Sequence, residues 1–164
     1  MSFDPVVPDA GVVEVVPVDG ETVVIESVTY PSQCPACGSE TECVGVQAFV
    51  GQRLEWDLGH NCSACGDAMY ECGPGGDRTP DDLRRRLLAV HGGARVVLGD
   101  RLAAPVLVMK VLRAELGADP TQAKEALQRI RAGTFTGTMP EMALLAHRLR
   151  AAGIEATADR PAAI

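Results

Sequence analysis

The sequence predicts an α+β fold in which a cysteine-rich β module precedes a small sandwich of three helices on a three-stranded sheet. Three observations support this prediction. β-branched runs flank an Asp-Gly dipeptide near the N-terminus, two cysteine clusters follow, and capped helices begin after the stretch GPGGDRTP. The 164 residues suffice for one ordinary domain or two small ones, and the break at GPGGDRTP favours two.

The first expected element is a β-hairpin, which with an N-terminal tail occupies residues 1–33. The runs VVEVVPV and TVVIESVTY are rich in β-branched residues, which favour extended strands. Asp19 and Gly20 stand between the runs, and an Asp-Gly pair favours a tight hairpin turn. Pro17 has no backbone N–H to donate, so it predicts that the first strand lies at a sheet edge.

Residues 34–78 hold two cysteine clusters with the same internal pattern. Each contains a Cys-x2-Cys pair followed directly by glycine, first Cys34 and Cys37, then Cys62 and Cys65. Two thiolates at this spacing can bind one tetrahedral ion, and the glycine adopts the positive φ that such turns need. Two extended runs between the pairs would form paired strands and bring the four thiols together.

This segment resembles a zinc ribbon, a small β module built on paired cysteine turns of rubredoxin type. The resemblance implies a Zn²⁺ ion held by the four cysteines of the two pairs. Iron suits the same four sulfur atoms, and unligated reduced thiols are the remaining alternative. The sequence lacks a signal-peptide pattern and a bilayer-length apolar run, so we expect a cytoplasmic protein in which disulfides would be unusual.

Two further cysteines, Cys43 and Cys72, each follow one of the pairs at similar spacing. This repeat predicts that they lie near each other across the ribbon. Three roles are open for them: small buried apolar residues, a reversible disulfide or zinc-linked redox switch, or ligands of a two-metal cluster. His60 comes shortly before Cys62, where it would replace a ligand, orient one or simply be exposed.

A connecting helix is expected at residues 79–93, after the Gly- and Pro-rich break. Thr79 offers a hydroxyl at the N-cap position, Pro80 fits the first helical position, and Gly92 is suited to the C-terminal end. Two acidic residues follow in the first turn, where the helix dipole favours negative charge.

Residues 94–164 alternate short strand-like runs with capped helices. Asp119 and Thr138 are the expected N-caps, and apolar residues recur behind each at helical spacing. With the strand-like runs ARVVLG, GTFTG and IEATA, the order becomes strand, helix, helix, strand, helix, strand. This order predicts helices on one face of a small sheet.

Within this module, the stretch VMKVLRAELGADPTQAKEAL resembles the helical elbow of the C-terminal domain of the bacterial ribosomal stalk protein. The resemblance covers residues 94–160 and implies that domain's fold. It also implies a partner-binding role for Lys110, Arg113 and Lys124, because the basic elbow residues of that family contact translational GTPases. The alternative is that these bases belong to a solvated helix surface. The positions that coincide with the family's signature are Val108, Lys110, Arg113, Gly117, Ala123 and Lys124.

Charge and missing motifs narrow the function classes. The chain has 22 acidic and 15 basic residues, and its N-terminal half is the more acidic, which disfavours binding to nucleic acid. It contains no phosphate-binding loop or HExxH motif, and a four-cysteine site leaves no open position for water. We therefore expect a non-catalytic, zinc-binding adaptor that recognises a protein partner through the elbow, with translation factors as one candidate class.

Two alternatives remain open. One is a thiol or zinc redox switch that uses Cys43 and Cys72. The other is an acidic inhibitor or immunity-type protein that masks a basic partner surface. The acidic residues that would carry that contact include Glu40, Glu42, Glu55 and Asp57.

Overall fold

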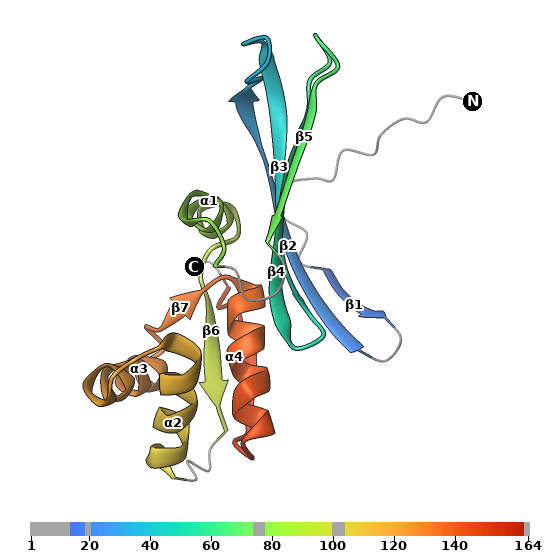
Figure 1. The fold of residues 1–164 in the computed structure, drawn as a ribbon. Helices are drawn as coiled ribbons and strands as arrows, with labels where there is room; N and C mark the ends of the chain where they lie inside the picture. Colours follow the sequence, from blue (N-terminus) through green and yellow to red (C-terminus); the bar gives the residue numbers. More distant parts are fainter. Residues whose placement is uncertain (1–13, 19–20, 74–77, 100–103, 163–164) are drawn as a thin grey trace.

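The computed structural model describes residues 14–18, 21–73, 78–99 and 104–162. Figure 1 shows an elongated molecule with a long twisted sheet at one end and a smaller helical part at the other. We call residues 94–162 the helical part, and residues 34–39 with 62–67 the cysteine end. The cysteine end lies at the tip of the long sheet, away from the helical part (Figure 1).

The long sheet is an antiparallel meander of five strands in chain order. The N-terminal hairpin is confirmed, with the first strand at a sheet edge as Pro17 predicts, although the turn at 19–20 lies outside the described residues. The two extended runs between the cysteine pairs do pair with each other. The strands are β1 (Glu14–Val18), β2 (Glu21–Gln33), β3 (Glu40–Val50), β4 (Arg53–Asn61) and β5 (Ala68–Gly73).

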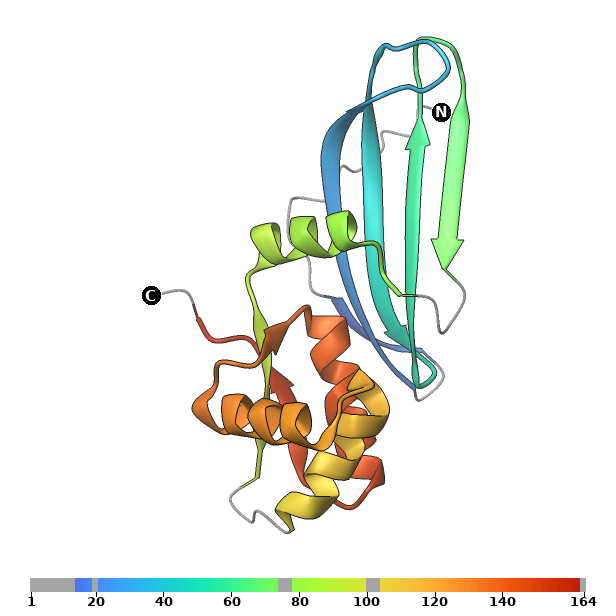
Figure 2. The same ribbon diagram turned by 60° about the vertical axis from the view of Figure 1, so that its left-hand side comes forward.

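The strand register defines two faces of this sheet. Val28, Gly45 and Leu58 lie opposite one another on β2, β3 and β4, and we call their side the inner face. Helix α1 (Asp81–His91) crosses this face (Figure 2) and buries Leu83 and Leu87 against it. A side chain at Gly45 would collide with Leu83, so glycine here permits the close approach of the helix. The opposite, outer face carries Val44 and Asp57, among others.

The helical part confirms the expected order of strand, helix, helix, strand, helix, strand. Its three strands form an antiparallel sheet in which the first strand is central. Asp119 and Thr138 are N-caps, each within a capping box, as the sequence predicts. The elements are β6 (Ala94–Leu98), α2 (Pro105–Leu116), α3 (Pro120–Ala132), β7 (Thr136–Gly137), α4 (Met139–Ala151) and β8 (Ala156–Asp159).

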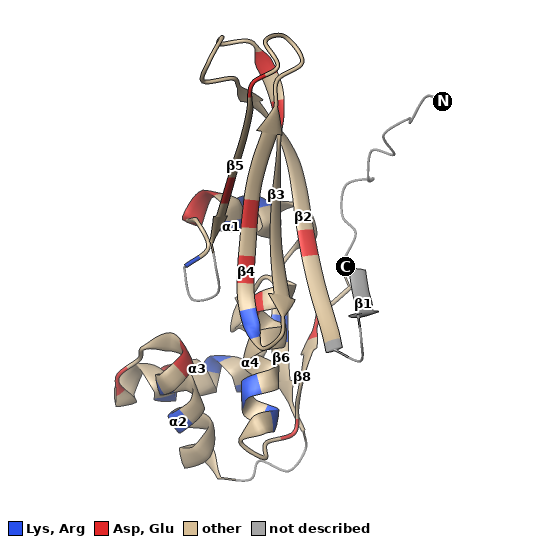
Figure 3. Ribbon diagram, turned by 45° about the vertical axis from the view of Figure 1, so that its right-hand side comes forward, with Lys and Arg blue, Asp and Glu red and all other residues tan. Residues whose placement is uncertain are grey.

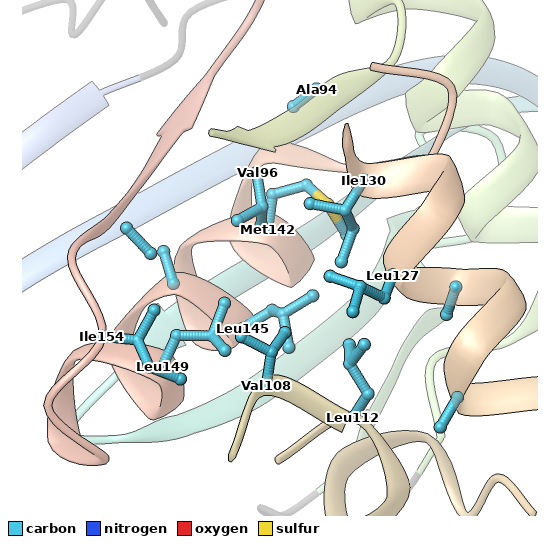
Figure 4. Packing of buried hydrophobic residues seen from close by; sticks show 14 residues of the cluster. Ala94, Val96, Val108, Leu112, Leu127, Ile130, Met142, Leu145, Leu149 and Ile154 are labelled. Carbon is cyan, nitrogen blue, oxygen red and sulfur yellow. The ribbon is translucent and has the colours of Figure 1, made fainter. Parts of the chain in front are cut away.

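The core of the helical part is aliphatic. Side chains from all three helices meet those of the small sheet, and Figure 4 shows them converging from the surrounding elements. The core residues labelled in Figure 4 are Ala94, Val96, Val108, Leu112, Leu127, Ile130, Met142, Leu145, Leu149 and Ile154.

None of the described helices is long and apolar enough to cross a membrane.

Helix α4 also contacts the long sheet, through β2, β3 and β4. A fully buried glutamine, Gln47 on β3, is central to this junction. Its amide nitrogen donates to the hydroxyl of Thr79 at 2.8 Å, and its amide oxygen accepts from the hydroxyl of Thr138. The expectation that Thr79 caps α1 is therefore wrong: Pro80 holds the N-cap position without a side-chain bond, because the Thr79 hydroxyl is used in this buried network.

Ion pairs reinforce the same junction. The guanidinium of Arg84 on α1 donates to both carboxylate oxygens of Glu141 on α4, at 2.7 and 3.0 Å. Arg160, after β8, pairs with the fully buried Glu26 on β2. A buried acid that has an arginine partner avoids most of the cost of an isolated charge. The two parts of the molecule are therefore joined by buried and partly buried polar contacts.

Candidate metal centre

The cysteine end consists of two short turns at the same tip of the long sheet. One turn joins β2 to β3, and the other joins β4 to β5. Because both hairpins run antiparallel within one sheet, their turns emerge side by side. The sequence-predicted pairing of the two Cys-x2-Cys segments therefore follows from the strand order.

The two turns have the same backbone geometry. In the first, the amide of Cys34 donates to the carbonyl of Ser39 at 2.8 Å, and the amide of Gly38 donates to the carbonyl of Cys34 at 2.8 Å. The glycine φ is 74° in the first turn and 76° in the second. A Cβ on either glycine would meet no atom within 4 Å, so the positive φ, rather than space, requires glycine. The second turn repeats both hydrogen bonds at 2.8 Å with Cys62, Asp67 and Gly66.

The four predicted ligands come together. The sulfur of Cys34 lies 3.7 Å from that of Cys65, and the sulfur of Cys37 lies 3.7 Å from that of Cys62. All four sulfur atoms lie within 4.8 Å of one another. These separations far exceed the roughly 2.05 Å of a disulfide, and all four cysteines are unbridged. They enclose a space that suits a single ion.

Burial follows the repeat of the two turns. The first cysteine of each pair is buried, with Cys34 2% and Cys62 3% exposed, whereas Cys37 and Cys65 are exposed. The site is therefore half enclosed by the sheet end and half open to solvent. An ion bound by these four sulfur atoms would lie at the protein surface.

The electrostatics of the thiols break this symmetry. Hydrogen bonds from the side chain and backbone of Ser39 lower the pKa of Cys37 to about 6. At Cys65 the backbone amide of Asp67 lowers the pKa, but the thiols of the other cysteines and loss of hydration outweigh it and raise the pKa to about 12. One thiol thus ionises readily while its equivalent keeps its proton, since several thiolates repel one another. A divalent cation would supply the charge that stabilises all four thiolates.

A second group of side chains supports the site from the inner face. His60 on β4 is 4% exposed, and its Nε2 lies 3.4 Å from a carboxylate oxygen of Asp67. Donor atoms of Cys34, His60 and Asp67 lie within 4.8 Å of one another. His60 thus lies beside the four-cysteine cluster, where it contacts the turn that carries Asp67. The sequence signal for Asp67 is its position after Gly66, which is equivalent to that of Ser39 in the first turn.

Cys43 and Cys72 are not brought together, and the expectation that they are close is wrong. Cys43 lies opposite His60 on the inner face, whereas Cys72 lies opposite Asp57 on the outer face. β4 stands between their strands, which are therefore about 9.6 Å apart, and Cys72 is also displaced along β5 from Met69, the residue in line with Cys43. Their backbones thus lie beyond the roughly 7 Å limit for a disulfide. The similar spacing after each pair suggested that the two cysteines are neighbours. At that spacing, however, the side chain on β3 lies on the inner face and the side chain on β5 lies on the outer face.

Cys43 instead belongs to a small inner-face group. It lies opposite Tyr30 on β2, and the guanidinium of Arg86 on α1 sits 3.8 Å from the centre of the Tyr30 ring. Burial, with Cys43 as a neighbour, raises the pKa of Tyr30. Cys43 is half-buried in this group, while Cys72 is exposed.

The three predicted elbow residues are all exposed. Lys110 and Arg113 lie on α2, and Lys124 lies on α3. Gly117 ends α2 in the left-handed conformation, and Asp119 caps α3 after a short link, which forms the bend between the two helices. The structure therefore has a helical elbow at the predicted position, with its three bases on the surface.

Comparisons with known proteins give no relative: no protein-family model, no curated protein and no solved structure matches the chain.

Proposed function

We propose that the chain binds one zinc ion through Cys34, Cys37, Cys62 and Cys65, and that this ion is structural. The observation that carries the proposal is the 3.7 Å separation between sulfur atoms of opposite turns. A tetrahedral Zn²⁺ with Zn–S bonds of about 2.3 Å requires sulfur atoms about 3.8 Å apart. The four thiols thus fit the ion without rearrangement of the turns.

A structural role follows from the ligand set. Four sulfur ligands complete a tetrahedron and leave no position for water or substrate, so we propose a non-catalytic site. The cysteine end also has few buried apolar side chains to hold its two turns together. Small modules of this kind gain much of their folding free energy from the bound metal.

Elemental analysis of the purified protein tests this proposal. We expect about one zinc per chain, and loss of the metal in Cys62→Ser, because the buried thiolate is removed. Cys72→Ser is the matched control, since Cys72 is an exposed cysteine on β5 outside the cluster, and it should keep the metal. Iron in place of zinc would change the assigned metal, while a metal-free and well-ordered cysteine end would contradict the proposal.

We further propose that the helical part has the fold of the ribosomal stalk C-terminal domain and that its elbow binds a protein partner, which makes the chain an adaptor. The order of the elements and the bend after α2 support this. Val106, Lys110 and Arg113 also fall at helical spacing on one stripe of α2, and Val106 is 72% exposed. An exposed apolar side chain beside two bases is typical of a docking surface rather than of plain solvated charge.

The resemblance to the stalk domain suggests purified translational GTPases as the binding partners to test. We expect the double variant Lys110→Glu and Arg113→Glu to bind such a probe at least several-fold more weakly, with stability changed by less than about 0.5 kcal/mol. Arg53→Glu is the control, because Arg53 is an exposed base at the start of β4. Equal loss in both variants, or no binding by the unmodified chain, would contradict this partner class.

A further inference from the structure

We propose that the free edge of β5 binds an extended, lysine- or arginine-bearing segment of a partner protein, which adds to the long sheet as a further strand. This binding surface is separate from the elbow. It rests on the proposed zinc site only because the ion fixes the turn from which β5 begins.

The backbone groups of β5 that face away from β4 follow from the hydrogen-bond pattern. Cys62 and Asp67 are bonded across the turn at 2.8 Å, and antiparallel pairs alternate between bonded and non-bonded positions. Ala68, Tyr70 and Cys72 therefore occupy non-bonded positions toward β4. Their N–H and C=O groups point outward from the edge of the sheet.

This edge is open. Ala68, Tyr70 and Cys72 are all exposed, and Tyr70 is 71% exposed. Figure 2 shows β5 along one border of the sheet, with no described helix or strand on its side away from β4. Sheet edges are commonly protected by proline, lysine or a bulge, and β5 carries only the charge of Glu71. An extended peptide could therefore pair with the outward-facing groups.

Tyr70 shapes the surface behind the edge. Its ring lies over Gly59 on β4, where an added Cβ would be 2.7 Å from the ring. Its hydroxyl donates to the side-chain oxygen of Asn61 at 3.1 Å, which fixes the ring against the outer face. Gly59 thus allows the ring to approach the neighbouring strand closely.

The outer face beyond Tyr70 forms a groove of about 670 Å³. Val44, 44% exposed, and Val46 provide apolar surface, while Glu42 and Asp57 provide carboxylates. A groove with apolar and acidic groups suits a long basic side chain, whose methylene stem packs on apolar surface while its charged end meets a carboxylate. The exposed Tyr70 ring adds a surface on which a cation can lie.

Charge favours a basic occupant over an acidic one. Asp57 stands next to β5 on the outer face, and Glu71 stands on the inner face of β5 itself. The outer face of β3 to β5 carries no lysine, and its one arginine, Arg53, lies at the end farthest from the cysteines. Figure 3 shows acidic residues along β4, with basic colour only at that end of the strand. The added strand would thus meet carboxylates on both of its faces.

The test uses the zinc-loaded full chain and two synthetic peptides of equal length. In the first peptide, lysine occupies every second position and valine or threonine occupies the others. The second peptide has glutamate in place of each lysine. We expect calorimetric titration to show binding of the lysine peptide that weakens with salt, and at least tenfold weaker binding of the glutamate peptide. Equal binding of both peptides would overturn the charge argument.

The variant Cys72→Pro tests the edge itself. Proline removes the outward N–H while leaving the bonds between β4 and β5 intact, since proline is tolerated on the open side of an edge strand. We expect at least tenfold weaker binding of the lysine peptide, whereas Cys72→Ser should bind as the unmodified chain does. Asp57→Asn should weaken binding several-fold through loss of charge.

Metal content and circular dichroism of the same samples separate the possible failures. A metal-loaded, folded chain that does not bind the lysine peptide overturns this proposal alone, and a chain without metal contradicts the zinc site. Retained binding by a folded Cys72→Pro variant overturns the edge as the site. If sedimentation shows that the unmodified chain is a dimer and that Cys72→Pro is a monomer, the edge binds a second copy of the chain. That result would overturn the partner proposed here.

Discussion

Aliphatic side chains fill the interior of the helical part, whereas four sulfur atoms occupy the corresponding place at the cysteine end. In the helical part, residues such as Leu112 and Leu149 are fully buried between the helices and the small sheet (Figure 4). Near the cysteine turns, the buried residues are Cys34, Cys62, Thr41 and His60, none of which is a large aliphatic side chain. The two ends of the molecule therefore differ in what fills their interiors.

The difference arises from how the layers are arranged. Helices cover one face of the small sheet, and α1 and α4 cover the inner face of the long sheet near its middle and lower end (Figures 1 and 2). No described helix reaches the tip that carries the cysteines. A sheet end without a covering layer buries little apolar area, so in the proposed function metal ligation would supply what the hydrophobic effect supplies elsewhere.

The largest expected effect is that of removing the metal. Structural zinc sites in small modules bind with apparent free energies of about 10–16 kcal/mol, so a chelator should unfold the cysteine end. Hydrogen exchange should show loss of protection in β5 and in the adjoining ends of β2 to β4, while helical circular dichroism is retained. Simultaneous loss of the helical signal would show instead that both ends unfold as one unit.

Truncation of the aliphatic core should destabilise the helical part and leave the metal site intact. Leu149→Ala removes a fully buried side chain and should lower the free energy of unfolding by about 2–5 kcal/mol, with metal content unchanged. Leu116→Ala, at a position 46% exposed on α2, is the matched control and should cost far less. Denaturant titration measures both, and loss of zinc in Leu149→Ala would show that the core and the metal site are coupled.

Gln47 tests the junction between the two regions. Gln47→Ala removes the acceptor of the Thr138 hydroxyl proton and the donor to the Thr79 hydroxyl oxygen, while the Thr138 oxygen still accepts from the amide of Glu141. Each buried group left unsatisfied costs about 1–3 kcal/mol. We expect a total loss of about 2–4 kcal/mol in the free energy of unfolding. Gln33→Ala, an exposed glutamine at the end of β2, should change it by less than about 0.5 kcal/mol. Equal effects of the two variants would contradict the role of the network.

Local sequence patterns predicted the elements well where one short segment determines the outcome. The pairing of β1 with β2, the capping boxes at Asp119 and Thr138, and the paired cysteine turns all depend on residues close together in the chain. Each of these features is decided by backbone conformation and hydrogen bonds within a few residues. Tertiary packing did not override them.

The failures involve contacts between residues distant in the chain. Thr79 was expected to cap α1, yet its hydroxyl bonds to Gln47, 32 positions earlier. Cys43 and Cys72 were expected to meet, yet the register places them on opposite faces of the sheet. The contact between His60 and Asp67 likewise depends on the alignment of β4 and β5. Strand register is set by the whole sheet, so spacing within one segment does not reveal it.

The smallest expected effect distinguishes the two cysteine turns from each other. Cys37 and Cys65 occupy equivalent positions, yet Ser39 lowers the pKa of Cys37 to about 6, while the surrounding thiols raise that of Cys65 to about 12. Since the ion binds thiolates, zinc affinity should rise with pH as protons are lost. Above pH 6 Cys37 is mostly ionised, so zinc binding releases no proton from it. Below pH 6 zinc must also displace the proton of Cys37, so the slope of zinc affinity against pH should be steeper below pH 6.

Ser39→Ala should move that change of slope. Without the Ser39 hydroxyl the pKa of Cys37 should rise, so the steeper region should extend to higher pH, and zinc affinity near pH 6.5 should fall by less than about tenfold. Competition with a chelator of known affinity, measured from pH 5.5 to 8, gives both curves. Ser63→Ala, which removes an exposed serine inside the second turn, is the control and should leave the curve unchanged. Identical curves for Ser39→Ala and the unmodified chain would contradict the proposed difference, because the two turns would then hold their thiolates equally well.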